Sequence, residues 1–164
     1  MKTYSLLILK PGSLKKKEEI IKLLKKNDME IVTSRESMFT RETMEFHYAE
    51  HYGKPFYNTL VEYMTTGNIK NLVQFPADCL AMVVTSTREN ESEEEFIARS
   101  RQVVKEVLRP ALTFNRNKFK FLSDEDFKEV CMTANGIHAS DSPASAVREV
   151  NNFFPDFFAE NEME

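Results

Sequence analysis

Short apolar runs alternate with segments of helical periodicity along this chain, and this alternation constrains the fold more than any other feature. Residues 4–9 form an apolar run that ends at Lys10 and a Pro-Gly turn signal, which is typical of a buried strand. The next segment, residues 13–26, places isoleucine and leucine at helical spacing within a lysine-rich surface. Strands separated by helices favour an α/β or α+β sandwich, in which helices cover a small sheet.

The later segments continue this pattern. Gly67 is a helix C-cap signal, Pro143 suits the first turn of a helix, and we expect Pro110 to end the helix before it. Residues 109–133 are ambiguous, and the acidic tail at 160–164 is expected to fray. The expected elements are a strand at 30–39, helices at 41–51 and 55–66, a strand at 79–85, a helix at 94–108, a short strand at 135–138 and a helix at 142–154.

Length and charge limit the classes of protein to consider. A chain of 164 residues, 41% of them apolar, is enough for one domain with a hydrophobic core, so we predict a single domain over residues 1–164. The net charge of -4 would repel nucleic acid and anionic lipid, so neither specific nucleic-acid binding nor a membrane partner is expected. A polyanionic ligand would need a local basic pocket.

The compartment is predicted from what the sequence lacks. The apolar run at 4–9 is shorter than the core of a secretory signal, and the run at 79–84 is far below the roughly 18 residues of a membrane span. Cys79 and Cys131 are too few for a disulfide framework. The expected location is therefore the cytoplasm.

The three histidines are His47, His51 and His138. His47 and His51 lie four residues apart on an expected helix, a spacing that can hold a metal, but no third ligand is indicated, so no metal site is predicted. His138 lies between an expected strand and a helix start, where free backbone N–H groups suit a phosphate. A neutral imidazole is a competent nucleophile, and Glu149 on the following helix could orient the ring.

The surroundings of His138 resemble one enzyme family. The segment Asn-Gly-Ile-His-Ala-Ser-Asp-Ser at 135–142 is similar to the catalytic motif of the nucleoside diphosphate kinases. Further blocks resemble the family in the same order, namely Leu-Ile-Leu-Lys-Pro at 7–11, His-Tyr-Ala-Glu-His at 47–51, Lys-Pro-Phe at 54–56, the stretch at 60–67 and Ala146 to Pro155. The fold we expect is α+β, a ferredoxin-like α/β sandwich whose small antiparallel sheet is covered by helices.

The resemblance assigns roles to several residues around His138, which would carry the phosphoryl group. It implies that Lys10 contacts the transferred phosphate, that Tyr48 supports it by hydrogen bonding and that Asn135 binds the ribose and phosphate end. Ser140 and Glu149 would be partners of His138.

The same resemblance places the base of the nucleotide on Phe56 and Leu60. Stacking on an aromatic ring does not depend on which base is present, which fits a broad nucleotide specificity. Each of these residues also has an ordinary structural interpretation, because aromatic side chains often pack in cores and charged ones often lie on the surface.

The chain departs from the family pattern at several positions. Gly12 replaces an aspartate, and the stretch Arg-x-x-x-Gly-x-Thr is matched by residues 105–111, with Lys105 for the arginine and Arg109 for the glycine. Lysine lacks the two-pronged fork of arginine, so Lys105, Arg109 and the downstream Arg116 are alternative phosphate ligands. The insert at 68–78 could add an edge strand or reshape an interface.

The predicted reaction is transfer of the γ-phosphate of a nucleoside triphosphate to a nucleoside diphosphate through phosphorylated His138. Mg²⁺ is expected to arrive bound to the nucleotide phosphates, because no acidic cage for it is visible. A homo-oligomer is expected, of unspecified size. The alternative is a catalytically weak nucleotide-binding or regulatory homologue, which Lys105 and Ala111 would favour.

Overall fold

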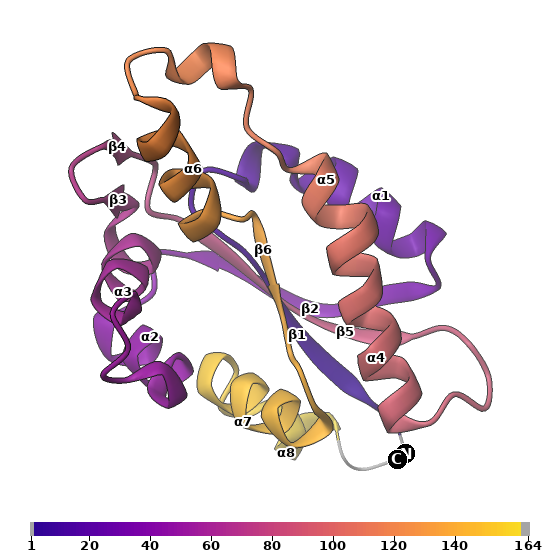
Figure 1. Cartoon of the computed structure of the whole chain (residues 1–164). Helices are drawn as coiled ribbons and strands as arrows, with labels where there is room; N and C mark the ends of the chain where they lie inside the picture. Colours follow the sequence, from indigo (N-terminus) through magenta and orange to yellow (C-terminus); the bar gives the residue numbers. More distant parts are fainter. Residues whose placement is uncertain (1, 162–164) are drawn as a thin grey trace.

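A four-stranded antiparallel sheet with the strand order β2-β5-β1-β6 is the centre of the protein in a computed structural model that describes residues 2–161 (Figure 1). The strands are β1 (Tyr4–Leu9), β2 (Met29–Ser37), β5 (Cys79–Ser86) and β6 (Ile137–Ala139). A helix follows β1 and leads into β2, and a longer helical stretch lies between β5 and β6, which with this strand order is the ferredoxin-like arrangement. The predicted fold class is confirmed.

The strand β1 separates two hydrophobic layers by the alternation of its side chains. Leu7 and Leu9 pack with one cluster, whereas Leu6 and Ile8 pack with the other, because successive residues of a strand point to opposite faces. The helices α1 and α4 cover the first face, and α2, α3 and α7 cover the second (Figure 1). These helices are α1 (Lys17–Lys26), α2 (Arg41–His47), α3 (Tyr57–Thr66), α4 (Glu93–Val103) and α7 (Pro143–Phe153).

Local signals in the sequence fix the ends of several helices. Ser92 and Glu95 form a reciprocal capping box at the start of α4, and the Ser142 hydroxyl accepts the Ser145 N–H at the start of α7. Gly67 ends α3 with a φ of 79°, as its C-cap prediction required. Within residues 2–161, every helix is too short or too polar to span a bilayer.

The expectation that Pro110 ends its helix was wrong. The helix continues after α4 through a π-helical segment, η3 (Val104–Leu108), and a further turn, α5 (Arg109–Ala111). The Arg109 N–H bonds to the Val104 carbonyl, five residues back, so the turn before Pro110 is wider than an α-helical one. That width accommodates a residue that has no N–H and whose ring would clash with a regular helix.

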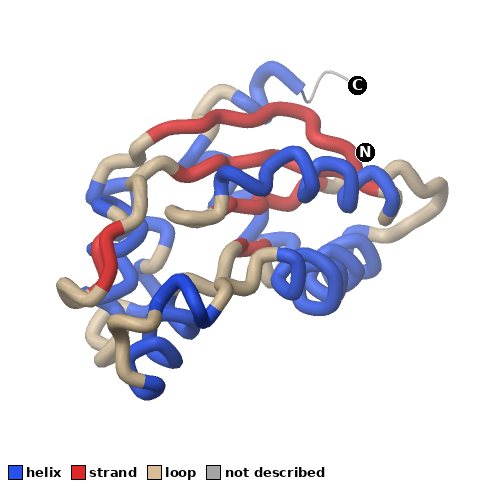
Figure 2. Tube along the Cα trace, turned by 90° about the horizontal axis from the view of Figure 1, so that it is seen from above, coloured by secondary structure: helices blue, strands red, loops and turns tan. Residues whose placement is uncertain are grey.

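The insert at 68–78 forms a separate hairpin rather than an added edge strand. The strands β3 (Asn68–Ile69) and β4 (Val73–Gln74) pair with each other and lie apart from the main sheet (Figure 2). An ion pair between Lys70 and Glu129 ties the hairpin to α6 (Asp124–Thr133), within the stretch that the sequence left ambiguous.

The C-terminal part of that ambiguous stretch and residues 160–161 of the tail are also helical. A short 3-10 turn, η4 (Arg116–Phe119), precedes α6, and α8 (Phe157–Asn161) follows α7. Glu160 therefore lies in a helix, contrary to the expected fraying, whereas residues 162–164 of the tail lie outside the described residues.

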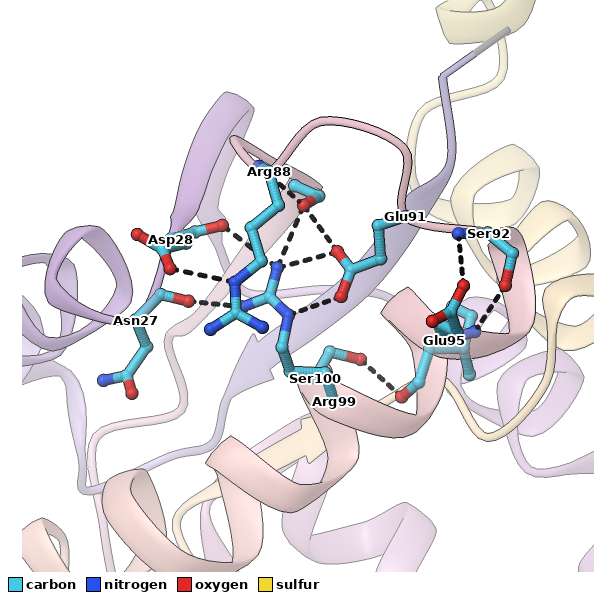
Figure 3. Close-up of polar contacts among 10 residues, drawn as sticks. Asn27, Asp28, Arg88, Glu91, Ser92, Glu95, Arg99 and Ser100 are labelled. Carbon is cyan, nitrogen blue, oxygen red and sulfur yellow. Dashed lines mark hydrogen bonds and ion pairs between the residues drawn. The ribbon is translucent and has the colours of Figure 1, made fainter.

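A buried ion pair joins α4 to the loop between β5 and α4. The side chains of Arg99 and Glu91 are only 12% and 9% exposed, and the Arg99 Nε lies 2.7 Å from Glu91 Oε2 (Figure 3). Arg99 also donates hydrogen bonds to the Ser86 hydroxyl and to the backbone carbonyls of Asn27 and Asp28. The guanidinium is thus surrounded by acceptors, which a shorter or uncharged side chain could not satisfy.

We predict that Arg99→Met lowers the free energy of unfolding by about 3–5 kcal/mol, because it leaves the Glu91 carboxylate buried without its partner. The matched control is Arg88→Met, since Arg88 pairs with Asp28 through side chains that are both 50% exposed. An exposed pair contributes at most about 1 kcal/mol. Urea unfolding of both variants measures the difference, and equal losses would contradict a special role for the buried pair.

Candidate active site

The pairing of β6 with β1 places His138 and Lys10 on the same face of the sheet. His138 lies directly opposite Ile8, and the Lys10 N–H donates to the Gly136 carbonyl at 2.9 Å. Gly136 has a φ of +94°, and a Cβ there would lie 2.8 Å from the Leu112 side chain. Only glycine therefore allows this close approach just before the histidine.

Glu149 and Ser140 hold the His138 ring. His138 Nε2 lies 2.8 Å from Glu149 Oε1, and the Ser140 hydroxyl donates to the same oxygen at 2.8 Å. The hydroxyl oxygen in turn accepts the Leu6 N–H at 3.0 Å, which orients its proton toward the carboxylate. The three side chains that the sequence grouped together are thus in direct contact.

Burial keeps the His138 ring neutral. Desolvation, followed by the positive charge of Lys10, lowers the pKa of His138 from 6.5 to about 3. Desolvation raises the pKa of Glu149, against the opposing effects of the nearby His47 and of the hydrogen bond from Ser140. A neutral ring that donates its Nε2 proton to Glu149 retains its lone pair on Nδ1, so Nδ1 is the nucleophilic atom.

Lys10 is a second ionisable group whose charge is destabilised by burial. Its Nζ donates to Asn135 Oδ1 at 2.8 Å, and its side chain is almost fully buried. Desolvation and the nearby Arg109 lower the pKa of Lys10 from 10.5 to about 7. A negatively charged ligand beside Lys10 would therefore stabilise its ammonium strongly, because burial leaves the positive charge poorly solvated.

His47 lies against His138 from the end of α2. The rings of His47 and His138 meet edge to face with centroids 4.5 Å apart, and the centroid of the Tyr48 ring also lies 4.5 Å from that of His47. The Tyr48 hydroxyl and both His47 ring nitrogens are buried without a hydrogen-bond partner among the described residues. Sequence reasoning paired His47 with His51 instead and missed its contact with His138.

The residues predicted to hold the base lie on the helical hairpin of α2 and α3. Phe56 is 48% exposed at the start of α3, next to the His51 ring, and Lys54 lies over its face. Leu60 is half-buried one turn further along α3 and packs against the core. An exposed aromatic ring supported by a partly buried leucine provides an apolar surface open to a ligand.

Two of the three alternative phosphate ligands lie near Asn135. Lys105 and Arg109 line a cavity of about 400 Å³ together with Asn135 and Cys131. A neighbouring cavity, also about 400 Å³, is lined by the same two cations and by Asp141. These positions are consistent with binding of an anion beside Lys10.

The third alternative, Arg116, is occupied elsewhere. Its guanidinium donates to the carbonyls of Phe119 and Leu122 and to Asp124, and it stacks over Phe127. These contacts stabilise the loop before α6. The structure does not bring Arg116 to the group around His138.

The departure at Gly12 is explained by the insert. Gly12 has a φ of +93°, and a Cβ at this position would lie 2.6 Å from the ring of Phe75, which follows the hairpin β3–β4. The Tyr63 hydroxyl donates to the carbonyl of the preceding Pro11 at 2.6 Å. Phe75 and Tyr63 thereby fix the turn that follows Lys10.

Comparison with known proteins agrees with this geometry. The family model described as nucleoside diphosphate kinase matches residues 3–158. The chain belongs to the nucleoside diphosphate kinase family. The nucleoside diphosphate kinase of Streptomyces coelicolor is 32% identical over 154 residues, which cover 92% of this chain and 95% of that protein. That of Hydrogenovibrio crunogenus is 30% identical, with 90% and 89% covered.

The fold is also that of a solved structure. A crystal structure of the Aquifex aeolicus nucleoside diphosphate kinase superimposes with a TM-score of 0.63 at 23% sequence identity, covering 94% of this chain and 96% of that one. The likeness extends along almost the whole of both chains, so the inserted hairpin is accommodated without loss of the shared architecture.

We predict that Lys10→Met changes how stability depends on pH. The folded-state pKa of Lys10 lies below its unfolded value, so the folded chain binds fewer protons between about pH 7 and 10.5. The wild-type free energy of unfolding therefore gains a contribution that rises with pH across this window. Lys10→Met lacks this contribution. Any excess in the free energy of unfolding of Lys10→Met over wild type at pH 7 and below should therefore decline as the pH rises.

Urea unfolding of both proteins across that window measures the difference. Parallel stability curves for wild type and Lys10→Met would show that the pKa of Lys10 is not lowered in the folded state.

Proposed function

We propose that this protein is a nucleoside diphosphate kinase whose phosphoryl carrier is His138. The observation that carries the proposal is the bond between His138 Nε2 and Glu149, which leaves the Nδ1 lone pair available next to the buried Lys10. A neutral nucleophile beside a lysine is the combination that phosphoryl transfer to an imidazole requires.

The reaction has two half-steps. His138 Nδ1 attacks the γ-phosphorus of a nucleoside triphosphate, and the bond from that phosphorus to the bridging β-oxygen breaks, which releases the diphosphate. A terminal oxygen of a second nucleoside diphosphate then attacks the phosphohistidine, and the imidazole leaves with its lone pair restored. Glu149 keeps the Nε2 proton in place and stabilises the positive charge that develops on the ring in the first step.

Cations around the nucleophile would stabilise the phosphate oxygens. Lys10 contacts the transferred group, Asn135 fixes the Lys10 ammonium and binds the ribose and phosphate end, and Lys105 and Arg109 bind the remaining phosphates. A phosphate near Lys10 also raises the pKa of its ammonium, so substrate binding restores the charge that burial disfavours. Tyr48 offers an unpaired hydroxyl to the same site.

Mg²⁺ would enter with the nucleotide and would supply positive charge to its phosphate groups. The chemistry of the site supports this route. Among the described residues, one group of side chains could hold a metal ion, and it consists of His47, His138 and Glu149. It supplies two imidazoles and one carboxylate, whereas Mg²⁺ prefers oxygen ligands. Phe56 and Leu60 would hold the base by contact that is insensitive to its identity.

The remaining expectations form part of the same proposal. The protein acts as one domain over residues 1–164, in the cytoplasm, as a homo-oligomer. Self-association is supported by the exposed edge strand β2, which carries the 38% exposed Val32 and is followed by the 63% exposed Met38. Apolar side chains along an unpaired edge favour association with another chain.

We predict that incubation with a nucleoside triphosphate and Mg²⁺ labels the protein with acid-labile phosphate on His138. His138→Asn should carry no label, and Glu149→Gln should acquire it more slowly, because the amide stabilises the developing imidazolium less well. Peptide mass spectrometry after rapid quenching locates the phosphate. Label on His47 or His51 would refute the assignment.

We further predict that Lys105→Ala lowers the rate of phosphotransfer by about ten-fold to hundred-fold, since a hydrogen bond to a charged group contributes roughly 1.5–3 kcal/mol. Lys105→Arg should preserve or raise the rate, because a guanidinium can bind phosphate through two hydrogen bonds. The matched control is Lys22→Ala, an exposed lysine of α1.

Steady-state exchange kinetics distinguish these variants. Equal, wild-type rates for Lys105→Ala and Lys22→Ala would remove Lys105 from the site and leave Arg109 as the phosphate ligand.

A further inference from the structure

Three side chains at the back of the active site have the arrangement of metal ligands. One ligand atom from each of His47, His138 and Glu149 lies within 4.8 Å of the others. The three come from different elements, since His47 ends α2, His138 lies in β6 and Glu149 lies in α7. Their proximity is therefore a product of the tertiary fold and not of a local sequence motif.

His47 is the independent sign that this cluster can take a ligand. Its side chain is 3% exposed, yet both ring nitrogens lack a hydrogen-bond partner among the described residues. Buried imidazole nitrogens normally have a hydrogen-bond partner. The His47 ring therefore has a lone pair that no described residue binds and that a metal ion could accept. It faces the His138 ring at a centroid distance of 4.5 Å.

We propose that His47, His138 and Glu149 bind a divalent transition-metal ion of the Zn²⁺ class. Two imidazoles and one carboxylate, with a fourth position left to water, are a common ligand set for such ions. Metal–ligand bonds of about 2.0–2.2 Å require the three ligand atoms to move together by small side-chain rotations. The ion takes the place of the proton between His138 Nε2 and Glu149, and the ring carries its proton on Nδ1 instead, so His138 binds the ion as a neutral imidazole.

The ligand set selects the kind of ion. Imidazole nitrogen suits Zn²⁺, Co²⁺ and Cu²⁺, whereas Mg²⁺ and Ca²⁺ require more oxygen ligands than this cluster offers. This site is thus distinct from the place where Mg²⁺ would bind, which is on the phosphates of the nucleotide. The His47–His51 pair suggested by sequence spacing is not the site, because His51 Nδ1 instead lies 3.3 Å from the Lys54 ammonium.

The surroundings of the cluster complete a metal centre. The Ser140 hydroxyl binds Glu149 Oε1 and so orients the carboxylate, in the manner of the outer contacts that support metal ligands. His138 remains 20% exposed in its side chain, which provides a path for the ion and space for its water. Arg148 Nη2 lies 3.9 Å from the other Glu149 oxygen and would weaken but not block the binding of a cation.

Occupancy of this site would stop phosphotransfer, a consequence that rests on the proposed function. The ion would hold His138 by Nε2 and leave the proton on Nδ1, so the lone pair that attacks the phosphate would no longer be available. The protein would then be inhibited by a transition-metal ion and restored by a chelator.

The experiment is a titration of the nucleotide-free, full-length protein with Co²⁺, followed by visible absorption, because Co²⁺ bound with low coordination number absorbs far more strongly than the hydrated ion. His47→Phe keeps an aromatic ring between Tyr48 and Phe153 and removes the ligand. His51→Phe is the matched control on the same segment, and Cys131→Ala tests the partly buried thiol of α6 as an alternative ligand. Thermal unfolding confirms that each variant is folded.

We expect one Co²⁺ per chain in wild type, His51→Phe and Cys131→Ala, and no saturable binding in His47→Phe. If His47→Phe does not fold, Ser140→Ala replaces it and should weaken Co²⁺ binding by roughly 10–100-fold. Absence of the band in wild type, unchanged affinity in His47→Phe or Ser140→Ala, or loss of the band in Cys131→Ala would overturn the proposal.

A second measurement separates this inference from the proposed function. Zn²⁺ should suppress phosphohistidine formation in the wild-type protein, and a chelator should restore it. If no phosphohistidine forms in the metal-free protein but the Co²⁺ band is present, the proposed function fails and the metal site stands. If phosphohistidine forms and no band appears, the metal site fails alone.

Discussion

The antiparallel pairing of β1 with β6 is the interaction on which the site depends. It joins the strands of the main sheet that come first and last along the chain, so that Ile8 lies opposite His138 and the Lys10 N–H donates to the Gly136 carbonyl. The short strand β6 has few residues with which to secure itself, and Gly136 allows it to pass close to Leu112. His138 and Lys10 are therefore placed by the hydrogen bonds of a sheet, which holds side chains more rigidly than a loop does.

Burial of His138 and Lys10 costs free energy, because it destabilises the charged form of each side chain. Desolvation lowers the pKa of both His138 and Lys10, so the folded protein holds a neutral imidazole next to an ammonium that is only weakly stabilised. Asn135 and the Glu149–Ser140 pair partly offset that cost. A polyanionic substrate would offset more of it, which is how a chain of net charge -4 can bind phosphate through a local group of cations.

Two departures from the family pattern are connected in three dimensions. Phe75, brought by the insert, occupies the space over Gly12 and stacks on Phe114 with centroids 5.2 Å apart and planes at 15°. Phe114 belongs to the loop between α5 and α6, where the family pattern is hardest to follow. The insert therefore supports both the turn after Lys10 and this altered loop, and the glycine and the hairpin depend on each other.

The sequence by itself predicted most of the elements and suggested a chemical role for His138. The apolar run of β1, the Ser142-Pro143 start of α7 and the glycine cap at Gly67 are local signals, and each was interpreted correctly because capping and periodicity act over a few residues. The resemblance to a family then supplied Lys10, Ser140, Asn135 and Glu149. Tertiary packing alone decided the passage of the helix through Pro110, the separate hairpin and the diversion of Arg116 into its own loop. It also decided that His47 meets His138 and not His51, because these contacts join residues far apart in the chain and depend on how helices pack on the sheet rather than on spacing along one helix.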